Sequence, residues 1–391
     1  MRIAFLCGGL GLGGVADYTR LLAGALKPYG AESLIIGLAD RDASAIQRDV
    51  SEDPPSLVLP AALSWRERTA AAQTALDAFA PDWVSLQFVP FAYNAKGVVW
   101  LEARWLQRLM AGRPAHVMLH ELWVEPLPRP VPMRRKVLRA AQRAAILRLL
   151  RAIRPEVLHT SNAVYLDLLA AAGLDARLLP LFGNVPVEPQ SDRAWLDEAL
   201  RAAGIDRARR PLLFGFFGGV APDWDADPLL TRLSDAVRSL GRPGVVLSVG
   251  FAGGMEERMR AWRRTHPELE FLTLGVQPIA RIAAYLQALD FGLTSYPYAL
   301  IGKSSSVVAM LEQGLPVIVA WGDLRPDLPA IDPELSPLVL RPGGDLRRFM
   351  SETQDRRPVG SRLPAVAAAM ADALVGKDLA GRGMKVAPLL G

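Results

Sequence analysis

Short apolar runs alternate with helix-length amphipathic segments along most of this chain. The runs at 3–7, 33–38, 83–88, 117–120 and 157–160 predict strands, and helical spacing appears at 17–26, 66–79 and 163–172. Strands that alternate with helices are typical of a parallel sheet covered by helices. The first part of the chain is therefore predicted to form one doubly wound α/β domain.

The alternation lapses between Phe182 and Arg210, where proline, alanine and charged residues surround one predicted helix at 192–203. A second series then begins with strands at 211–217, 245–250 and 271–274, and a helix is expected at 364–374. We predict an α/β fold of two Rossmann-like domains facing a central cleft. Residues 1–183 form the first domain and 184–365 the second, and a tail, 366–391, packs back towards the first domain.

The sequence Gly302-Lys303-Ser304-Ser305-Ser306 lies between an apolar run and a helix-length segment, and Gly314-Leu315-Pro316 leads into another strand. This pattern predicts a βαβ unit whose helix is opened by the serines. Hydroxyls, free N–H groups at the positive helix end and the charge of Lys303 favour a phosphate ligand. The alternative is an ordinary serine N-cap beside a solvated lysine.

The composition narrows the class of protein. A chain of 391 residues with 51% hydrophobic content predicts two or three domains with substantial cores. Its single cysteine, Cys7, excludes an intramolecular disulfide, indicates a reducing compartment and is expected to be buried in the first strand. No apolar run is long enough to span a bilayer, and the first apolar segment is too short for a signal peptide. We expect a cytoplasmic protein.

The net charge of +5 is unevenly distributed. Eight basic residues and no acidic ones occur between Arg134 and Arg154: Arg134, Arg135, Lys136, Arg139, Arg143, Arg148, Arg151 and Arg154. A basic amphipathic helix at 134–154 would suit peripheral contact with the anionic inner face of a membrane. The alternative is a surface helix that packs its apolar stripe on its own domain. Nucleic acid is not expected as a partner, because no aromatic residues interleave the basic ones.

Other motifs compete for the function. Gly9-x-Gly11-x-x-Gly14 matches the dinucleotide fingerprint, although the acid that should follow, Asp40, comes 29 residues after Gly11 instead of about 20. An NAD-dependent oxidoreductase is therefore kept as an alternative. The P-loop pattern fails because Pro297 occupies the position of its first glycine. Asp223, Asp225 and Asp227 could hold a divalent metal, but their place before a helix favours a cap. We expect no metal and no cofactor.

Several motifs together resemble the retaining GT-B glycosyltransferases (family 4-like) that build bacterial polysaccharides and glycolipids. They occur in the family's order: Gly13-Gly14 before the first helix, His120-Glu121 at a strand end, Gly183-Asn184-Val185-Pro186 at the domain entrance, Gly218 after a strand, Gly275-Val276 at the expected nucleobase position, and Gly314-Leu315-Pro316-Val317. The resemblance covers nearly the whole chain. It implies transfer of a hexosyl or deoxyhexosyl group from a nucleoside diphosphate sugar to a glycan, a lipid-linked molecule or a small molecule.

The chain departs from this family at the donor site. The positions of the family's two glutamates hold Ile301 and Ala309, and Gly219 replaces an arginine that grips the diphosphate. A catalytically silent nucleotide-binding protein with the same fold is therefore another alternative. For an active enzyme, Lys303 and the serine turn would stabilise the departing diphosphate without a metal.

Our predicted site residues fall into three groups. His120 and Lys303 are the catalytic candidates, and the alternative for His120 is a strand-end histidine bonded to the backbone. The donor-binding candidates are Gly218, Gly219, Gly275, Val276, Gly302, Ser304, Ser305 and Ser306. The candidates on the acceptor or phosphate side are Gly13, Gly14, Asp17 and Glu121.

Overall fold

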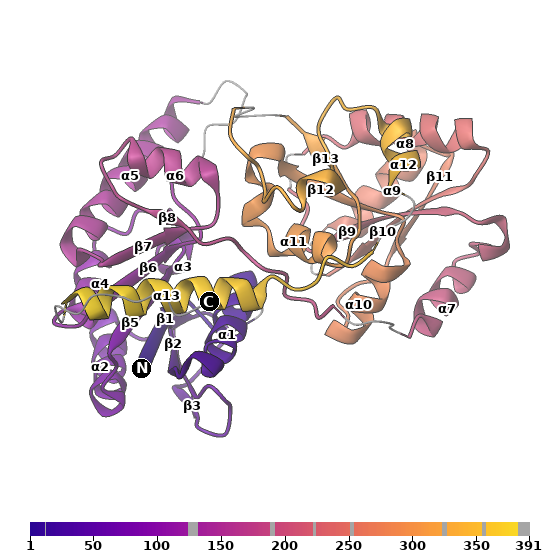
Figure 1. The fold of residues 1–391 in the computed structure, drawn as a ribbon. Coiled ribbons are helices and arrows are strands. Elements are labelled where there is room, and N and C mark those ends of the chain that lie inside the picture. Colours follow the sequence, from indigo (N-terminus) through magenta and orange to yellow (C-terminus); the bar gives the residue numbers. More distant parts are fainter. Residues whose placement is uncertain are drawn as a thin grey trace. The chain divides into compact units, whose positions relative to one another are not determined.

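A computed structural model describes residues 1–11, 13–123, 132–187, 192–221, 224–250, 254–322, 327–353 and 357–381. The chain divides into two compact units (Figure 1). The N-terminal unit comprises Met1–Pro180 together with Leu363–Gly391, and the C-terminal unit comprises Leu181–Arg362. Each unit is built around its own sheet.

The sheet of the N-terminal unit has eight strands in the order β3-β4-β2-β1-β5-β6-β7-β8. They are β1 (Arg2–Cys7), β2 (Glu32–Asp40), β3 (Gln47–Asp49), β4 (Ser56–Pro60), β5 (Trp83–Phe88), β6 (Ala115–Leu119), β7 (Val157–Thr160) and β8 (Arg177–Leu178). Only the β3–β4 pair is antiparallel; the other pairs are parallel. The chain reverses its direction of travel across the sheet between β1 and β5. This is the topological switch point at which open α/β sheets bind ligands.

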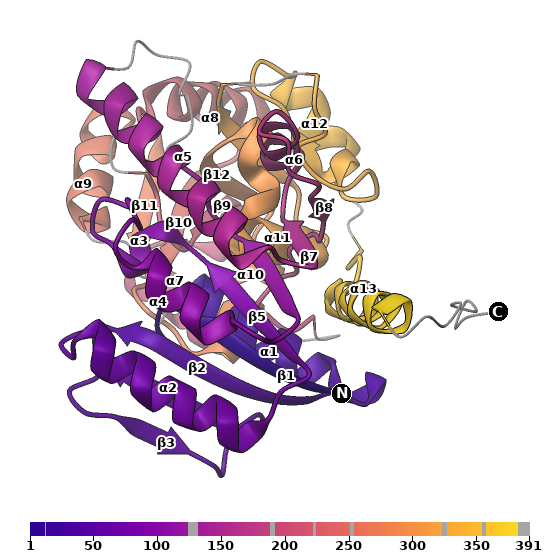
Figure 2. The ribbon, with the colours of Figure 1, turned by 90° about the vertical axis from the view of Figure 1, so that its left-hand side faces the viewer.

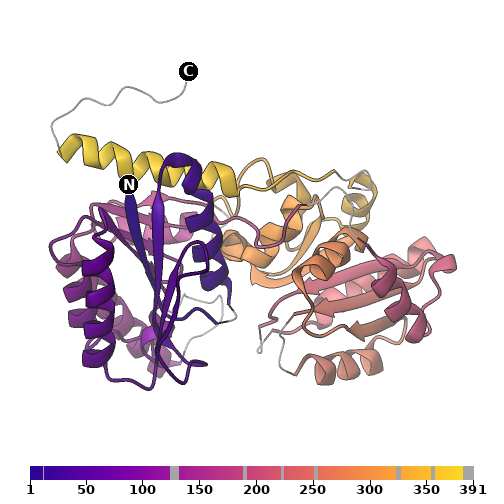
Figure 3. The same cartoon turned by 90° about the horizontal axis from the view of Figure 1, so that it is seen from below.

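Helices lie on both sides of this sheet (Figure 3). They are α1 (Gly14–Ala25), η1 (Lys27–Tyr29), α2 (Trp65–Phe79), α3 (Pro90–Tyr93), α4 (Ala103–Met110), α5 (Met133–Ile153), α6 (Ala163–Ala170) and α13 (Leu363–Gly381). α2, α4 and α5 form a row of neighbouring helices (Figure 2), whereas α1 packs against α13. Local signals fix several helix starts: Ser64 and Glu67 form a capping box on α2, and Asn162 caps α6.

The sheet of the C-terminal unit has six parallel strands in the order β11-β10-β9-β12-β13-β14. They are β9 (Leu212–Phe217), β10 (Gly244–Val249), β11 (Leu269–Thr273), β12 (Phe291–Pro297), β13 (Val317–Trp321) and β14 (Val339–Leu340). The helices are α7 (Ala194–Ala202), η2 (Arg207–Arg209), α8 (Asp227–Leu240), α9 (Met255–Thr265), α10 (Ile279–Ala288), η3 (Tyr298–Lys303), α11 (Ser305–Glu312), η4 (Ser336–Leu338) and α12 (Leu346–Glu352). This strand order places the switch point between β9 and β12.

Close packing explains one glycine in this sheet. The Tyr285 hydroxyl of α10 donates to the carbonyls of Phe216 and Leu247, at 2.9 and 3.3 Å, and so joins β9 to β10. A Cβ on Gly215 would lie only 2.3 Å from that hydroxyl oxygen. Glycine at this position therefore lets α10 pack closely against β9 and β10.

The predicted α/β fold with two Rossmann-like domains is confirmed, and Cys7 is fully buried. The structure divides the chain at 180/181 and 362/363, whereas the sequence placed the boundaries at 183/184 and 365/366. The helix expected at 364–374 is present as part of α13, and the sequence analysis did not anticipate α12 in the stretch before it. Within the described residues, no helix combines the length and apolar character needed to cross a bilayer.

Candidate functional site

In the C-terminal unit the serine turn opens a helix, as the sequence pattern predicts. α11 begins after Ser304, whose Oγ accepts a hydrogen bond from the Val307 N–H at 3.4 Å. Ser305 and Ser306 form the first helical turn and are partly exposed. Lys303 is the last residue of η3 and is also partly exposed. The lysine and two serine hydroxyls thus gather at the positive end of α11.

Three other turns meet at the same edge of the sheet. Gly218, which follows β9, has a φ of +81°, and a Cβ on it would lie 2.8 Å from Ser306 Oγ. Gly250, which follows β10, has a φ of +107°, and a Cβ there would come within 3.1 Å of the Gly218 backbone. The Gly250 N–H donates to the carbonyl of Gly275 at 2.9 Å. The Gly218 N–H in turn donates to the carbonyl of Val249 at 2.9 Å. Side-chain-free turns therefore converge beside Ser306 at the switch point, where the absence of Cβ atoms lets a ligand approach the start of α11.

The remaining donor-site candidates lie around this convergence. Gly219 follows Gly218 and is exposed, and Val276 follows Gly275 and is 61% exposed. Gly302 is buried inside η3, so it shapes the turn and is not one of the exposed groups. Gly218, Gly219, Gly275 and Val276 thus expose backbone or apolar surface at the carboxyl edge of the sheet, and Gly302 does not.

Ile301 and Ala309, where the resemblance led us to expect two glutamates, are fully buried. Both belong to one of the two buried apolar clusters of the C-terminal unit. A carboxylate at either position would have to be buried among hydrocarbon side chains, at a cost of several kcal/mol. These two residues therefore serve the core, and the turn at 302–306 supplies the polar groups.

An arginine that the sequence analysis did not single out organises the loop after β9. Arg258 of α9 donates to the carbonyls of Ala221 and Trp224, at 2.9 and 3.1 Å, and lies over the ring of Trp262. Burial lowers the pKa of its guanidinium. Arg258 thus holds Ala221 and Trp224, which both follow β9, to the same guanidinium. Its two partners lie 37 and 34 residues away along the chain, so the sequence alone gave no sign of this role.

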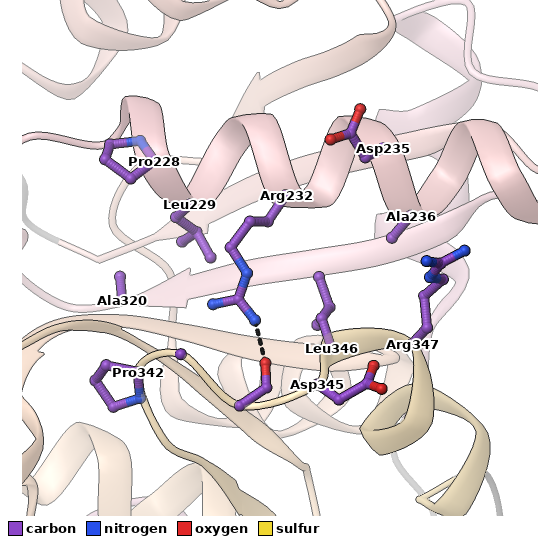
Figure 4. A pocket seen from close by; sticks show the side chains of 12 residues that line it. Pro228, Leu229, Arg232, Asp235, Ala236, Ala320, Pro342, Asp345, Leu346 and Arg347 are labelled. Carbon is purple, nitrogen blue, oxygen red and sulfur yellow. Dashed lines mark hydrogen bonds between the residues drawn. The ribbon is translucent and has the colours of Figure 1, made fainter.

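The C-terminal unit also has a hollow of about 730 Å³, which lies beside α8 and α12 (Figure 4). Across it, the Arg232 guanidinium donates to the carbonyl of Gly344. Asp235, Asp345 and Arg347 add charges of both signs to its walls, and the Asp345 carboxylate is engaged as the cap of α12. None of the predicted site residues lines this hollow. In the acidic cluster that could have held a metal, Asp225 accepts a hydrogen bond from the Asp227 N–H. Asp223 lies outside the described residues.

In the N-terminal unit the glycine-rich loop is fastened by Asp40. One carboxylate oxygen accepts from the N–H groups of Leu10 and Gly11, at 2.7 and 3.1 Å, and the other accepts from Asp42 and Ala43. These four backbone N–H groups counter the effect of burial and lower the pKa of Asp40. In a dinucleotide enzyme this acid would bind a ribose hydroxyl. Here its oxygens are occupied by the loop, which argues against the oxidoreductase alternative.

A hollow of about 290 Å³ lies at the switch point of this sheet. It is lined by Gly8, Gly9, Gly11, Gly13, Gly14, Val15, Ala16, Ala39, Asp40, Arg41, Asp42, Gln87, Val89 and Ala92. Gly13 is the N-cap of α1 and provides no side-chain cap, so the first N–H groups of the helix border this space. Asp17 follows in the first turn of α1. The predicted Gly13 and Gly14 thus line the hollow.

His120 is 7% exposed and does not line this hollow, but it contacts Gln87, which does. Its Nε2 is 2.9 Å from Gln87 Oε1, so the predicted alternative of a backbone-bonded ring does not describe its side chain. Gln87 Nε2 donates to Ser85 Oγ at 2.8 Å, Ser85 Oγ is 2.7 Å from His116 Nδ1, and His116 Nε2 is 3.0 Å from His159 Nδ1. A continuous chain of buried hydrogen bonds therefore connects three histidines.

Burial keeps these rings neutral. It lowers the pKa of His120 to about 3 and that of His159 to about 4, where nearby Arg177 adds to the effect. Burial and the neighbouring histidines also hold the pKa of His116 well below its usual value. The ring of Tyr18 packs edge-on against His120, with 4.8 Å between centroids. Glu121 follows His120 in the chain and is partly exposed.

Gln87, which contacts both the hollow and His120, was missed by the sequence analysis. A signal was available: Ser85 and Gln87 alternate with Val84, Leu86 and Phe88 along a buried strand, which puts both polar side chains on one face. His116 and His120 are four residues apart near the next strand, an even spacing that also puts both on one face, and His116 pairs with Ser85. Matching polar positions on paired strands could have pointed to a shared network.

Comparisons with known proteins place the fold. Neither the family models nor the curated proteins gave a match to this sequence. Among solved structures, Anabaena Alr3699/HepE in complex with UDP-glucose is 15% identical and aligns with a TM-score of 0.57 over 98% of this chain and 99% of its own. The apo form of the lipopolysaccharide outer core galactosyltransferase WaaB is 14% identical, with a TM-score of 0.53 over 98% and 99%.

A third solved structure is UDP-GlcNAc 2-epimerase from Neisseria meningitidis bound to UDP-GlcNAc. It is 10% identical, with a TM-score of 0.51 over 96% of this chain and 100% of its own. At such identities the likeness concerns the fold, which is that of the GT-B glycosyltransferases. Since an epimerase shares it, the reaction must be argued from the site.

Proposed function

We propose that this protein is a glycosyltransferase that moves a hexosyl or deoxyhexosyl group from a nucleoside diphosphate sugar to an acceptor. The donor would bind at the carboxyl edge of the C-terminal sheet, and a glycan, lipid-linked or small-molecule acceptor would bind in the N-terminal unit. The observation that carries the proposal is the meeting of Gly218, Gly250 and Ser306 at the start of α11. The first N–H groups of α11, two hydroxyls and the Lys303 ammonium in one place suit a diphosphate.

The proposed reaction needs no metal. The bond between the anomeric carbon and the diphosphate oxygen breaks, the acceptor oxygen bonds to that carbon, and the acceptor proton leaves with the diphosphate. Lys303, Ser305 and Ser306 would stabilise the charge that develops on the departing oxygen. Retention of the anomeric configuration is part of the proposal through the family resemblance. Solved structures with the same fold that hold UDP-glucose support a nucleotide sugar as the donor.

We further propose contact with the cytoplasmic face of an anionic membrane through α5. Most basic side chains of this helix are exposed, and so are Met133 and Val137, at 70% and 62%. Arg148 lies over the ring of Trp100, which with Leu101 adds exposed apolar surface beside the helix. Cations next to exposed apolar and indole groups suit a lipid interface.

Thermal unfolding with UDP, GDP, ADP, dTDP and NADH tests the donor site. A ligand at 100 times its dissociation constant stabilises a protein by about 2.7 kcal/mol, which is a shift of a few degrees. We expect one nucleoside diphosphate to raise the melting temperature of the wild type, and Lys303→Ala to lose most of that shift. A shift with NADH alone would instead support the oxidoreductase alternative. Binding of a nucleoside diphosphate without hydrolysis of any nucleotide sugar would support the silent protein.

Two glycine substitutions provide a matched pair for this experiment. Gly218→Ala puts a methyl group 2.8 Å from Ser306 Oγ at a φ of +81°, whereas Gly241→Ala, at the end of α8, has a φ of +61° and open space around it. Both changes strain a left-handed residue by about 1 kcal/mol. Only Gly218→Ala should reduce the shift caused by the nucleotide. Equal shifts in the two variants would contradict the placement of the donor beside Ser306.

A further inference from the structure

The hydrogen bonds that link His120, Gln87, Ser85, His116 and His159 all run the same way from donor to acceptor. Gln87 Oε1 faces His120 Nε2, and a carboxamide oxygen only accepts, so this nitrogen of His120 carries the ring proton. The Gln87 amide nitrogen donates to Ser85 Oγ, which leaves the hydroxyl proton of Ser85 for His116 Nδ1. The first half of the chain therefore runs from His120 towards His116.

His116 continues the chain in the same sense. A neutral imidazole has one N–H, so a ring that accepts at Nδ1 donates from Nε2, here to His159 Nδ1 at 3.0 Å. All five side chains are at most 7% exposed, so water does not readily replace a lost partner. Turning the Gln87 amide over would require Ser85 and all three histidines to reverse their protons together. Such a chain holds its members in place because each bond polarises the next.

Gln87 is the member of the chain that borders the hollow at the switch point. A carboxamide has two N–H donors and two oxygen lone pairs, and the chain uses one of each. The remaining N–H and lone pair lie on the same rigid amide group. A hydroxyl group both donates and accepts, so it matches this pair, whereas an anion would use only the N–H.

We propose that Gln87 is a ligand-binding residue that contacts a hydroxyl group of the acceptor, with its amide orientation fixed by Ser85, His116 and His159. This inference rests on the proposed function. The last three side chains are positioning residues, because they act through Gln87. His120 holds the other end of the same amide.

Ring nitrogen NMR on the full-length protein labelled with ¹⁵N tests the chain without any substrate. The protein has four histidines, so the ring signals can be assigned by substitution. We expect His116, His120 and His159 all to carry the proton on Nε2. Ser85→Ala should break the chain and give His116 and His159 averaged tautomer signals, whereas Ser85→Thr, which keeps the hydroxyl, should preserve them. Opposed tautomers in the wild type, or unchanged signals in Ser85→Ala, would overturn the proposal.

Initial rates with UDP-glucose as donor and methyl glucosides as acceptors test the ligand contact. Gln87→Leu and Ser85→Ala should raise the KM for the acceptor about three- to tenfold, the worth of one neutral hydrogen bond, and leave the KM for UDP-glucose unchanged. Thr160→Val is the control, because Thr160 is a buried residue of β7 outside the chain, bonded to the carbonyl of Leu119. An unchanged acceptor KM in Gln87→Leu would overturn the contact. Failure of the wild type to consume any nucleotide sugar would count against the proposed function instead, and the ring spectra would still decide the chain.

Discussion

At the scale of single residues, the buried histidines make stability depend on pH. The pKa of His120 falls to about 3 and that of His159 to about 4 in the folded protein, against about 6.5 in an unfolded chain. Below pH 6.5 the unfolded state therefore binds protons that the folded state does not. We expect the free energy of unfolding to fall as the pH is lowered from 7 to 5, approaching about 1.4 kcal/mol per pH unit for each such histidine.

Urea unfolding at several pH values measures this slope. His159→Gln removes one titrating ring, so its slope near pH 5 should be shallower than that of the wild type by about 1.4 kcal/mol per pH unit. Thr160→Val, which does not titrate, should keep the wild-type slope. Asp40 acts in the same direction but only near and below pH 4, since its pKa is lowered from an ordinary value of 3.8. An unchanged slope in His159→Gln would contradict neutral burial of that ring.

The residue scale also shows what the sequence could and could not predict. The serines of the 302–306 turn were recognisable because a helix start has local signals, and Ser304 does cap α11. Gln87 and Arg258 were not, because their partners lie far away in the chain: His120 for the first, and Ala221 for the second. Contacts of this kind follow from strand pairing and helix placement, which hydrophobic periodicity does not specify.

At the scale of elements, α5 tests the membrane proposal. Cations near an anionic bilayer contribute about 1 kcal/mol each, so replacing Arg139, Arg143 and Arg151 with glutamate should weaken binding more than a hundredfold. Sedimentation with vesicles that contain phosphatidylglycerol measures this, and wild-type binding should fade as salt is added. A matched variant changes Arg260, Arg264 and Arg347 of the C-terminal unit, which carry the same charge. Equal loss of binding in both variants would show that net charge alone matters, and no loss would contradict the role of α5.

Element length explains which parts of the fold the sequence revealed. β5 and β7 are buried runs bounded by polar or turn residues, and their predicted limits agree with the structure. β4 was missed because Pro54, Pro55 and Pro60 flank three apolar residues, a pattern that reads as a loop. β8 and β14 have two residues each, which is too short for any periodicity. Such strands exist because a neighbouring strand offers free backbone groups, and that is a tertiary property.

At the scale of the whole molecule, the two sheets repeat one plan. Each has a β-strand order that reverses at its centre, a glycine-rich turn after its first strand and a helix that opens beside that turn. The lapse in alternation between 182 and 210 made this division predictable. Periodicity did not show which face of α13 would be buried. This helix is apolar around much of its circumference and has no clear apolar stripe.

Because α13 packs on the N-terminal unit, we expect its removal to lower the unfolding temperature of that unit and not of the other. Val366, Ala367, Met370, Ala371 and Leu374 are at most 4% exposed. The helix packs against α1 and β7 of the N-terminal unit, although it follows the C-terminal unit in the chain. Truncation after Arg362 would expose the apolar surface of both partners, at a cost of about 1.5–3 kcal/mol for each large side chain. We therefore expect the N-terminal unit to unfold at a clearly lower temperature.

Calorimetry of the truncated protein, with and without UDP, measures both units at once. The transition of the N-terminal unit should move to lower temperature or disappear, while the transition of the C-terminal unit should stay in place. Gly218, Gly250 and Ser306 lie at one sheet edge of the C-terminal unit. If the donor site belongs wholly to that unit, UDP should still raise the unfolding temperature of the C-terminal unit after truncation. Loss of the UDP effect together with α13 would mean that the donor site depends on the N-terminal unit, and the assignment of the nucleotide to the C-terminal sheet alone would be wrong.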